Sequence, residues 1–341
     1  MNAIDFFCGG GGTTRGLINA GIDVIFGLDN NPSCRETYEY NNGVPYLCHS
    51  IQEVEAQNLV ADFPVLADND NLLMVGCAPC QPFSSQRKSP IPHTARNLLD
   101  EFGRIVEELL PAHVLIENVP LIRSRGYDVL QRFLDLLDQL GFHYTYLTVN
   151  AKNYGVPQSR KRFVLMASRF FVPTIPLPTH GRNLLPYVTV RDAIQRFPEL
   201  MAGERHEEIP NHNASRVSEI NLERLNATPH DGGDRRAWPE ELVLNCHTNY
   251  NGHTDVYGRM FWDRVSPTLT SKCCSISNGR FGHPIQNRAI SFREAAALQS
   301  FPDNYIFFGG SQEIGRQIGN AVPVLLSQAM GEYILNMHKE I

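Results

Sequence analysis

The sequence predicts an α/β fold with a mostly parallel sheet, to which a smaller, irregular module is added. In the first 170 residues, short apolar runs alternate with stretches of helical periodicity. Strands separated by helices of this length indicate crossover connections, which give a sheet covered on both faces. The alternation stops after Phe171, and helical periodicity returns only towards the C-terminus. Ligands of such a sheet lie at the carboxyl ends of its strands, so a site is expected there.

The predicted elements follow one another in a regular order. Strands are expected at Ala3–Phe7, Val24–Leu28, Leu72–Gly76, Val114–Ile116, Tyr144–Val149 and Phe163–Met166, with a further strand ending at His49–Ile51. Helices are expected at Thr13–Ala20, Pro32–Asn41, Asn97–Leu110 and Tyr127–Leu140, and near the C-terminus at Ser291–Gln299 and Pro323–Met337. The module between them, within residues 173–260, contains eight prolines and no clean periodicity. This pattern is typical of irregular structure.

Composition places the chain among globular proteins. Hydrophobic residues make up 42% and charged residues 19%, and no apolar stretch reaches the roughly twenty residues of a membrane span. The N-terminus lacks the basic segment and apolar core of a signal peptide, so a cytoplasmic location with reduced cysteines is expected. The formal net charge is −6, yet residues 86–99, 151–180 and 264–293 contain no acid. Three such basic runs in an acidic protein favour a polyanionic partner.

The cysteines are candidates for metal or redox sites. The chain has eight of them, too few for disulfides to hold a chain of this length together. Cys77 and Cys80, with two residues between them, fit a redox pair, half a zinc site or one nucleophile with a bystander. Cys246–His247 and Cys273–Cys274 are adjacent pairs, whereas zinc ligands usually have two intervening residues. No structural metal is expected.

Four predicted strand ends carry candidate site residues. Asp5–Gly12 joins a strand to a helix, and its glycines allow a tight turn and close approach of a nucleotide-like cofactor. Asp29 ends the next strand, where it would bond ribose hydroxyls or cap a helix. Cys80 follows the strand Leu72–Gly76, and a thiol is the best nucleophile among side chains. Glu117 ends the neighbouring strand, where a lone acid is more often structural than catalytic.

The segment Gln158–Arg162 adds positive charge near these strand ends. A strand beginning near Gln158 would send Gln158, Arg160 and Arg162 to one face. The two guanidinium groups could then hold phosphates or a carbonyl oxygen. Further along, Gly319–Pro323 opens the final predicted helix with a turn and an early proline.

Taken in order, these segments resemble the motifs of DNA cytosine-5 methyltransferases, and the resemblance covers nearly the whole chain. The matching motifs are Asp5–Gly12, Pro79–Ser84, Glu117–Val119, Gln158–Arg162, Arg293–Glu294 with Leu298–Pro302, and Gly319–Pro323. Six matches in the family's order are very specific. The resemblance implies a catalytic and cofactor-binding domain over residues 1–175, a target-recognition domain over 176–290, and a return to the catalytic domain over 291–341.

The resemblance also implies S-adenosylmethionine as the cofactor, double-stranded DNA as the substrate, and a Rossmann-like methyltransferase fold. The expected cofactor contacts are Phe7, Gly9, Gly11, Gly12, Asp29, Ser50, Ile51, Pro79, Asn320 and Val322. The expected DNA contacts are Gln81, Ser84, Arg87, Lys88, Arg96, Gln158 and Lys272. Arg216, Arg224, Arg235 and Arg236 are further candidates for reading bases in the recognition region. We expect a monomer, with a cognate restriction or defence system as a further partner.

The chain departs from the family pattern at several places. Asp29 stands where the family commonly has Glu, and Ser50 where it usually has an acid that accepts the adenine amino group. Cys77 occupies a position often filled by glycine, and the loop 85–96 has prolines in place of the usual glycines. These departures bear on how ribose and adenine are held and on how the loop closes.

The implied chemistry suits these residue types. Cytosine C5 is a poor nucleophile, so a Cys80 thiolate that adds at C6 creates an enamine whose C5 can take a methyl group. Glu117, protonated or hydrogen-bonded to N3, would offset the charge in the ring, and burial would favour that state. Arg162 would hold O2, and Arg160 would organise the site. The cytosine must leave the stacked duplex, at a cost of roughly a few kcal/mol.

Three other interpretations remain open from the sequence. A thioredoxin-like redox protein explains Cys77 and Cys80 but leaves the remaining motifs unexplained. A non-catalytic nucleic-acid-binding protein gives no reason for Cys80, Glu117 and the glycine-rich loop together. Methylation of RNA by the same chemistry, as in the tRNA branch of the family, is a closer rival. A recognition module of about a hundred residues, a full-sized domain, favours duplex DNA.

Overall fold

The computed structural model describes residues 1–78, 98–248, 252 and 255–341. The chain forms two compact units. The first comprises Met1–Tyr154, Lys161–Pro178 and Val322–Ile341, and the second comprises Gly155–Arg160 and Thr179–Ala321. Among the described residues, no helix is long and apolar enough to span a membrane.

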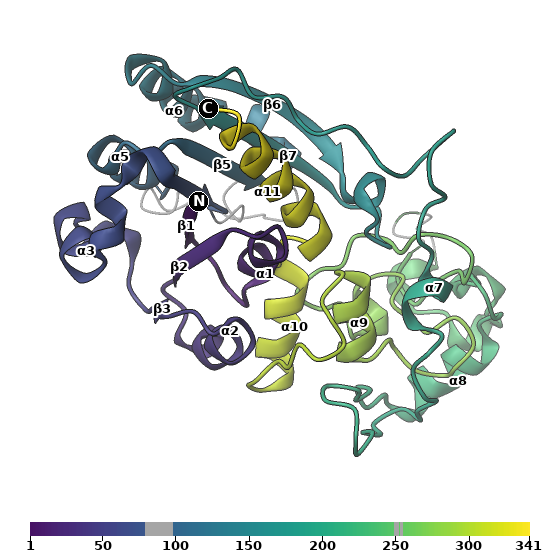
Figure 1. The fold of residues 1–341 in the computed structure, drawn as a ribbon. Coiled ribbons are helices and arrows are strands. Elements are labelled where there is room, and N and C mark those ends of the chain that lie inside the picture. Colours follow the sequence, from purple (N-terminus) through teal and green to yellow (C-terminus); the bar gives the residue numbers. More distant parts are fainter. Residues whose placement is uncertain (79–97, 249–251, 253–254) are drawn as a thin grey trace. The chain divides into compact units, whose positions relative to one another are not determined.

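The first unit is built on a seven-stranded sheet, which confirms the predicted α/β fold (Figure 1). Its strands are β1 (Asn2–Phe6), β2 (Asp23–Leu28), β3 (Tyr46–Leu47), β4 (Leu72–Gly76), β5 (His113–Asn118), β6 (His143–Asn150) and β7 (Lys161–Ser168). They lie in the order β3-β2-β1-β4-β5-β7-β6. Pairing is parallel from β3 to β5, and β7 runs antiparallel to both of its neighbours. The carboxyl ends of β1, β2, β4 and β5 therefore share one edge.

Side chains that alternate along the strands pack against different helices. The helices of this unit are α1 (Gly12–Asn19), α2 (Arg35–Asn42), α3 (Ala56–Asp62), α5 (Leu98–Leu109), α6 (Tyr127–Gln139) and α11 (Val324–His338). Met74 and Ile116 belong to a core cluster with residues of α5 and α6, such as Phe102. Their sequence neighbours Val75 and Leu115 instead line a pocket with side chains of α11. Because successive strand residues point to opposite faces, the sheet is covered on both.

The first and last helices of this unit pack closely, with α11 (yellow) alongside α1 (purple) in Figure 1. Gly16 makes this approach possible. A Cβ atom at Gly16 would lie 2.6 Å from the Ser327 Cβ and 2.6 Å from the Val324 carbonyl oxygen. The C-terminal helix is thereby held beside the helix that follows the glycine-rich loop, although about three hundred residues of sequence separate them.

We expect Gly16→Ala to destabilise the first unit by about 1–3 kcal/mol, the usual cost of overpacking a closely packed contact. The obstacle includes backbone atoms of α11, which cannot move aside as a flexible side chain can. The free energy of unfolding, measured by urea denaturation, checks this. Gly310→Ala is the matched control, because a Cβ there meets only the Glu313 Oε2 at an ordinary 3.5 Å. Equal stability of the two variants would contradict the prediction.

The second unit contains short helices joined by long irregular segments. Its helices are α7 (Val190–Ile194), α8 (Glu219–Ala227), α9 (Phe292–Leu298) and α10 (Ser311–Asn320). Buried arginines tie the segments together. Arg293 donates to the carbonyl oxygens of Pro210, Pro302 and Tyr305. These bonds satisfy backbone carbonyl groups of loops, which lack the hydrogen-bond partners that a neighbouring strand would supply.

The motif Arg293–Glu294 is thus a structural element of the second unit. Both carboxylate oxygens of Glu294 lie 2.7 Å from the guanidinium of Arg288. Burial alone would raise the pKa of Glu294, but the hydrogen bonds and charge of Arg288 outweigh it and lower that pKa to about 2. Glu294 also forms a capping box with Ser291 at the start of α9, because Glu294 accepts from the Ser291 backbone N–H and the Ser291 hydroxyl accepts from the Glu294 backbone N–H.

Three sequence predictions about elements differ from the structure. The strand expected to begin near Gln158 begins at Lys161, so Gln158 and Arg160 do not share a strand face with Arg162. The strand expected to end at His49–Ile51 is only Tyr46–Leu47. Helices α3, α7, α8 and α10 had no predicted counterpart. The predicted division into a catalytic domain over residues 1–175 and 291–341 and a target-recognition domain over 176–290 stays a prediction.

Candidate active site at the carboxyl edge of the sheet

The glycine-rich loop lies between β1 and α1 and has an unusual backbone. Phe7, Gly9 and Gly11 have φ values of 61°, 49° and 84°. Glycine adopts such positive φ values without steric cost, which explains its use here. A Cβ atom at Gly9 would meet nothing within 4 Å, so the space beside this loop is open. The first turn of α1, which begins at Gly12, follows at once.

Asp29, at the end of β2, holds the loop in place. Its Oδ2 accepts a hydrogen bond from the Gly9 backbone N–H at 3.0 Å, and its Oδ1 accepts one from Asn31 N–H at 2.9 Å. Burial raises the pKa of Asp29, although these backbone donors oppose the shift. From the sequence, Asp29 was expected either to bond ribose hydroxyls or to cap a helix. The structure shows an acid that already bonds local backbone, with further lone pairs available on both oxygens.

The residues expected near the adenine follow β3. Ser50 begins a single 3-10 turn that spans Ile51–Glu53, and its side chain caps no N–H group there. Ile51 is buried, and its carbonyl oxygen accepts from Arg104 on α5 at 3.2 Å. Ser50 therefore stands in the place where the family commonly has an acid, while the Ile51 side chain packs into the core of the first unit.

Cys77 is a half-buried thiol whose surroundings favour its neutral form. Its Sγ lies 3.5 Å from the Thr13 hydroxyl of α1. Burial raises its pKa well above the ordinary thiol value, and the nearby charges of Glu117 and Asp5 raise it further. A thiol exchanges disulfides through its thiolate. The structure therefore weighs against the thioredoxin-like interpretation.

Glu117 and Arg162 form an ion pair across β5 and β7. The Arg162 Nε lies 2.7 Å from the Glu117 Oε1, and the two side chains are 15% and 11% exposed, Glu117 first. Strand β5 ends and strand β7 begins near this point, because the two strands pair antiparallel and Asn118 lies opposite Phe163. The sequence predicted both residues for the site but treated them separately. Their pairing places a fixed carboxylate and a fixed guanidinium together at the edge where ligands bind.

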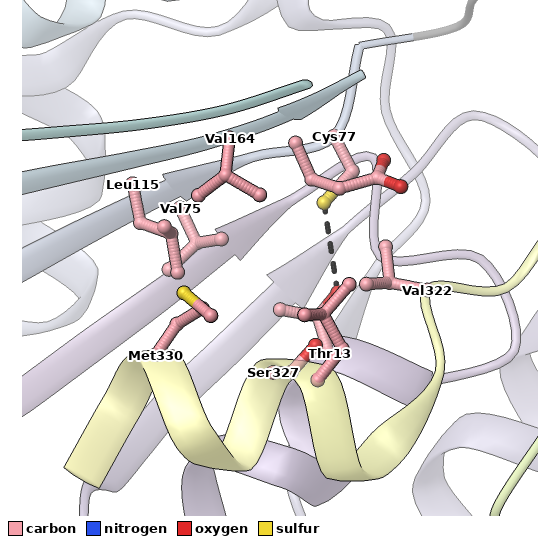
Figure 2. A pocket seen from close by; sticks show the side chains of 10 residues that line it. Thr13, Val75, Cys77, Leu115, Val164, Val322, Ser327 and Met330 are labelled. Carbon is pink, nitrogen blue, oxygen red and sulfur yellow. Dashed lines mark hydrogen bonds between the residues drawn. The ribbon is translucent and has the colours of Figure 1, made fainter. Parts of the chain in front are cut away.

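A small pocket opens beside Glu117 of this pair (Figure 2). It is lined by Thr13, Val75, Cys77, Leu115, Glu117, Val164, Val322, Leu326, Ser327 and Met330. Figure 2 shows Ser327 and Met330 reaching up from α11, with the contact between Thr13 and Cys77 above them. Val322, an expected cofactor contact, therefore shares a pocket with Glu117.

Asn118 positions the chain that leads towards Cys80. Its side-chain amide donates to the Ala78 carbonyl oxygen at 3.2 Å, and its Oδ1 accepts from the Val119 N–H at 2.8 Å. The asparagine of the motif Glu117–Val119 thus ties the end of β5 to the segment after β4. Seven predicted site residues lie outside the described residues, namely Pro79, Cys80, Gln81, Ser84, Arg87, Lys88 and Arg96.

Arg160 and Gln158 are internal to the second unit. The guanidinium of Arg160 donates to the Leu269 and Gly319 carbonyl oxygens at 2.9 and 3.0 Å. The side-chain amide of Gln158 is fully buried and bonds Gln299 and the Leu269 N–H. This burial is the physical reason for moving Gln158 from the expected DNA contacts to the framework of this unit. Asn320 ends α10 with its side chain exposed.

The candidate base-reading side chains of the second unit fall into two groups. Arg224 donates to the Leu242 carbonyl oxygen and packs over Trp238, and Arg235 is buried. These two arginines serve the unit internally. Arg216, Arg236 and Lys272 are exposed, although Arg236 is paired with Asp234. Exposed, positively charged side chains such as these can reach the phosphates or the base edges of DNA.

The described residues contain no group of three histidine, cysteine or acidic side chains arranged to hold a metal ion. Cys246 is exposed, and Cys273 and Cys274 are buried neighbours whose sulfur atoms lie 3.9 Å apart. The absence of a structural metal stays a prediction.

Comparison with known proteins decides the family. A model of the C-5 cytosine-specific DNA methylase family matches residues 1–336. The chain belongs to this family. It is similar to the Type II methylase M.HgiDII of Herpetosiphon aurantiacus, with 44% identity covering 97% of this chain and 94% of that protein. It is also similar to the Type II methyltransferase M1.HphI of Haemophilus parahaemolyticus, with 34% identity over 99% and 87% of the two chains.

Solved structures agree on the fold. A structure described as a DNA modification methyltransferase encoded within an Escherichia coli prophage superimposes with a TM-score of 0.78 at 21% identity, covering 98% of this chain and 99% of that one. A mutant of Spodoptera frugiperda DNMT2 superimposes with a TM-score of 0.65 at 15% identity, covering 99% of each chain. The predicted resemblance and fold class are confirmed, and this methylase is an enzyme of the DNA cytosine-5 methyltransferase class.

The structure separates two arginines that the sequence grouped. We expect Arg162→Ala to reduce turnover far more than it weakens nonspecific DNA binding, because Arg162 holds Glu117 at the pocket. Arg160→Ala should mainly lower the free energy of unfolding, because it leaves two buried carbonyl oxygens of the second unit without donors. Single-turnover assays, filter binding over a salt series and urea denaturation distinguish these outcomes. An Arg162→Ala enzyme that turns over normally and changes only its salt dependence would exclude Arg162 from the site.

Proposed function

We propose that this methylase transfers a methyl group from S-adenosylmethionine to carbon 5 of a flipped-out cytosine in a specific duplex DNA sequence, through a covalent Cys80 adduct at C6. The observation that carries the proposal is the ion pair of Glu117 and Arg162 beside the pocket. It lies at the strand edge that also carries the glycine-rich loop and, through Asn118, the segment entering Pro79–Cys80.

The residues around the loop fit the proposed cofactor. A Cβ atom at Gly9 would meet nothing within 4 Å, so this glycine leaves room for a ligand. Asp29 would offer carboxylate lone pairs to ribose hydroxyls, and Val322 contributes apolar surface to the pocket. Gly11 and the buried Ile51 stay expected contacts. Ser50 is the polar group available to the adenine. When bound, the cofactor supplies an electrophilic methyl group. These side chains and loop atoms would bind and orient it, and Asn320 is the remaining expected contact.

The proposed chemistry begins at Cys80. Its thiolate would add to C6 and the ring electrons would move to C5. C5 would then bond to the methyl carbon as the bond between that carbon and the cofactor's sulfur breaks, its electron pair remaining on the sulfur as a neutral thioether. Loss of the C5 proton then restores the double bond and expels the thiolate. No residue is assigned as the base for this proton, and water suffices in principle.

Glu117 and Arg162 would act on the ring during these steps. A carboxyl group hydrogen-bonded to N3 and a guanidinium on O2 both stabilise the negative charge that builds as the thiolate adds. The ion pair holds both groups at 2.7 Å from one another before the base arrives. Preorganised groups of this kind stabilise a transition state without the cost of reorientation.

The DNA partner and the biological setting complete the proposal. The flipped base requires contacts that repay unstacking, and the candidates are Gln81, Ser84, Arg87, Lys88 and Arg96 of the segment outside the described residues, together with Lys272. The similar Type II methyltransferases suggest a modification enzyme paired with a restriction enzyme. A monomer in the cytoplasm is the form we propose.

Bisulfite sequencing of DNA from cells that express the protein tests this function and identifies the target. We expect cytosines that resist bisulfite conversion at one recurring sequence. Purified protein with labelled cofactor should transfer the label to duplexes that contain this sequence. A matched duplex with 5-fluorocytosine at the target should trap a protein–DNA adduct that Cys80→Ala does not form. Methylation of RNA but not of duplex DNA, or of exocyclic nitrogen rather than C5, would contradict the proposal.

A further inference from the structure

Asp5 is a buried acid directly below the glycine-rich loop. It is the fourth residue of β1 (Asn2–Phe6) and its side chain is 0% exposed. The Thr14 hydroxyl of α1 donates to the Asp5 Oδ2 at 2.7 Å and lies 2.9 Å from the Tyr38 hydroxyl of α2. The Asp5 Oδ1 has no hydrogen-bond partner among the described residues. A buried carboxylate with one oxygen unpaired is costly unless something compensates it.

The groups that face Asp5 do not supply a positive charge. Asp29 at the end of β2 is the charged neighbour that acts on it, and it has the same sign. The thiols of Cys8 in the loop and Cys77 after β4 also face it, and Asp5 raises the pKa of both. No ion pair between described residues includes Asp5 or Asp29. Within the described part of the chain, two acids thus lie under one loop without a base.

Burial decides the protonation state of Asp5. Burial is the largest influence and raises the pKa of Asp5 to about 7, the charge of Asp29 raises it further, and the Thr14 hydroxyl opposes both. Near neutral pH, Asp5 is therefore poised between its neutral and ionised forms. A cation placed above the loop would favour the ionised form, because an opposite charge nearby stabilises a carboxylate.

We propose that Asp5 and Asp29 supply negative charge beneath the glycine-rich loop, that the cationic cofactor balances this charge, and that binding of S-adenosylmethionine therefore releases the Asp5 proton into solvent. This inference rests on the proposed function. S-adenosylhomocysteine, the demethylated product, has one positive charge fewer because its sulfur is a neutral thioether. Asp5 therefore favours the substrate form of the cofactor over the product form, and re-protonation after methyl transfer favours product release.

The size of the effect follows from linkage. With a pKa of about 7, Asp5 is about half protonated at pH 7, so S-adenosylmethionine should release about half a proton more than S-adenosylhomocysteine does. If the bound cation lowers the Asp5 pKa below 6, the dissociation constant for S-adenosylmethionine should fall about tenfold between pH 6 and pH 8. The dissociation constant for S-adenosylhomocysteine should change much less over that range.

Calorimetric titration of the whole protein tests this inference without any turnover. Titrations with each ligand at pH 7, in phosphate and in Tris, give the number of protons released, since the two buffers differ in ionisation enthalpy. Asp5→Asn should abolish the extra release and flatten the pH dependence of S-adenosylmethionine affinity. Asp62→Asn, which changes an exposed acid of α3, is the matched control and should leave both unchanged.

A stability measurement on the free protein provides an independent check. A carboxyl whose folded pKa is raised binds protons more tightly when folded, so its contribution to the free energy of unfolding falls as pH rises from about 4 to about 7. Subtracting the Asp5→Asn profile from the wild-type profile should show this fall, with the variant relatively more stable above pH 7.

Thr14→Val keeps the inference testable if Asp5→Asn does not fold. The variant removes the hydroxyl that lowers the Asp5 pKa, so proton release should persist at pH 8, where the wild-type release has nearly ended. Equal proton release with both ligands, unchanged in these variants, would overturn the inference. That result differs from failure of the proposed function, in which wild-type protein would not bind S-adenosylmethionine.

Discussion

Replacing Cys80 by alanine should abolish methyl transfer while leaving the affinity for S-adenosylmethionine close to that of the wild type. The expected loss is complete within detection, because no other group in the proposed mechanism can add to C6 and activate C5. Cofactor affinity should survive because the glycine-rich loop and Asp29 are held by their own contacts, such as the 3.0 Å bond from the Gly9 N–H. Transfer of labelled methyl groups and calorimetric cofactor titration measure the two quantities separately.

Two cysteine variants serve as controls for this prediction. Cys246→Ala changes an exposed cysteine of the second unit and should leave turnover near the wild-type value. Cys77→Ser should lose far less activity than Cys80→Ala, since burial keeps Cys77 a neutral thiol. If Cys77→Ser were as inactive as Cys80→Ala, a redox pair would regain support. Loss of cofactor binding in Cys80→Ala would show that the nucleophile and the cofactor loop are not separate parts.

Replacing Glu117 by glutamine should slow the chemical step by about 10² to 10⁴, the range for groups that act as general acids or bases. Glutamine keeps the shape and a hydrogen-bonding group but loses the ionisable carboxyl and the ion pair with Arg162. DNA and cofactor affinity should change much less. Single-turnover rates at saturating DNA and cofactor measure this effect. A rate within a few-fold of the wild type would remove Glu117 from the mechanism.

The ion pair makes a sharper test available. If Glu117 and Arg162 act as one unit, the double variant Glu117→Gln with Arg162→Ala should be little slower than the slower single variant, whereas independent roles would multiply the two losses. Glu108→Gln is the matched control, because it breaks an i,i+4 ion pair with Arg104 on α5. That change should lower stability slightly and leave the single-turnover rate unaltered.

Local sequence patterns were sufficient to predict most strands and helices of the first unit in their order along the chain, and the order of the motifs was sufficient to indicate the family. Apolar runs such as Leu72–Gly76 and periodic stretches such as Tyr127–Leu140 carry local information, because strand and helix periods are properties of neighbouring residues. The first became β4, and the second lies within one residue of α6. Because strand ends follow from strand positions, the sequence also placed Asp29 and Glu117 at the ligand edge of the sheet.

The contacts of the candidate side chains, in contrast, depend on tertiary packing. Arg160 and Arg162 are two residues apart, yet Arg160 bonds the Leu269 and Gly319 carbonyl oxygens while Arg162 pairs with Glu117. Likewise, nothing in the sequence around Asp5 indicates that its Oδ1 would be buried without a partner among the described residues. The partner of a side chain and the burial of a charge depend on elements that pack from distant parts of the chain, and neither is recorded in the local pattern that predicts a strand or a helix.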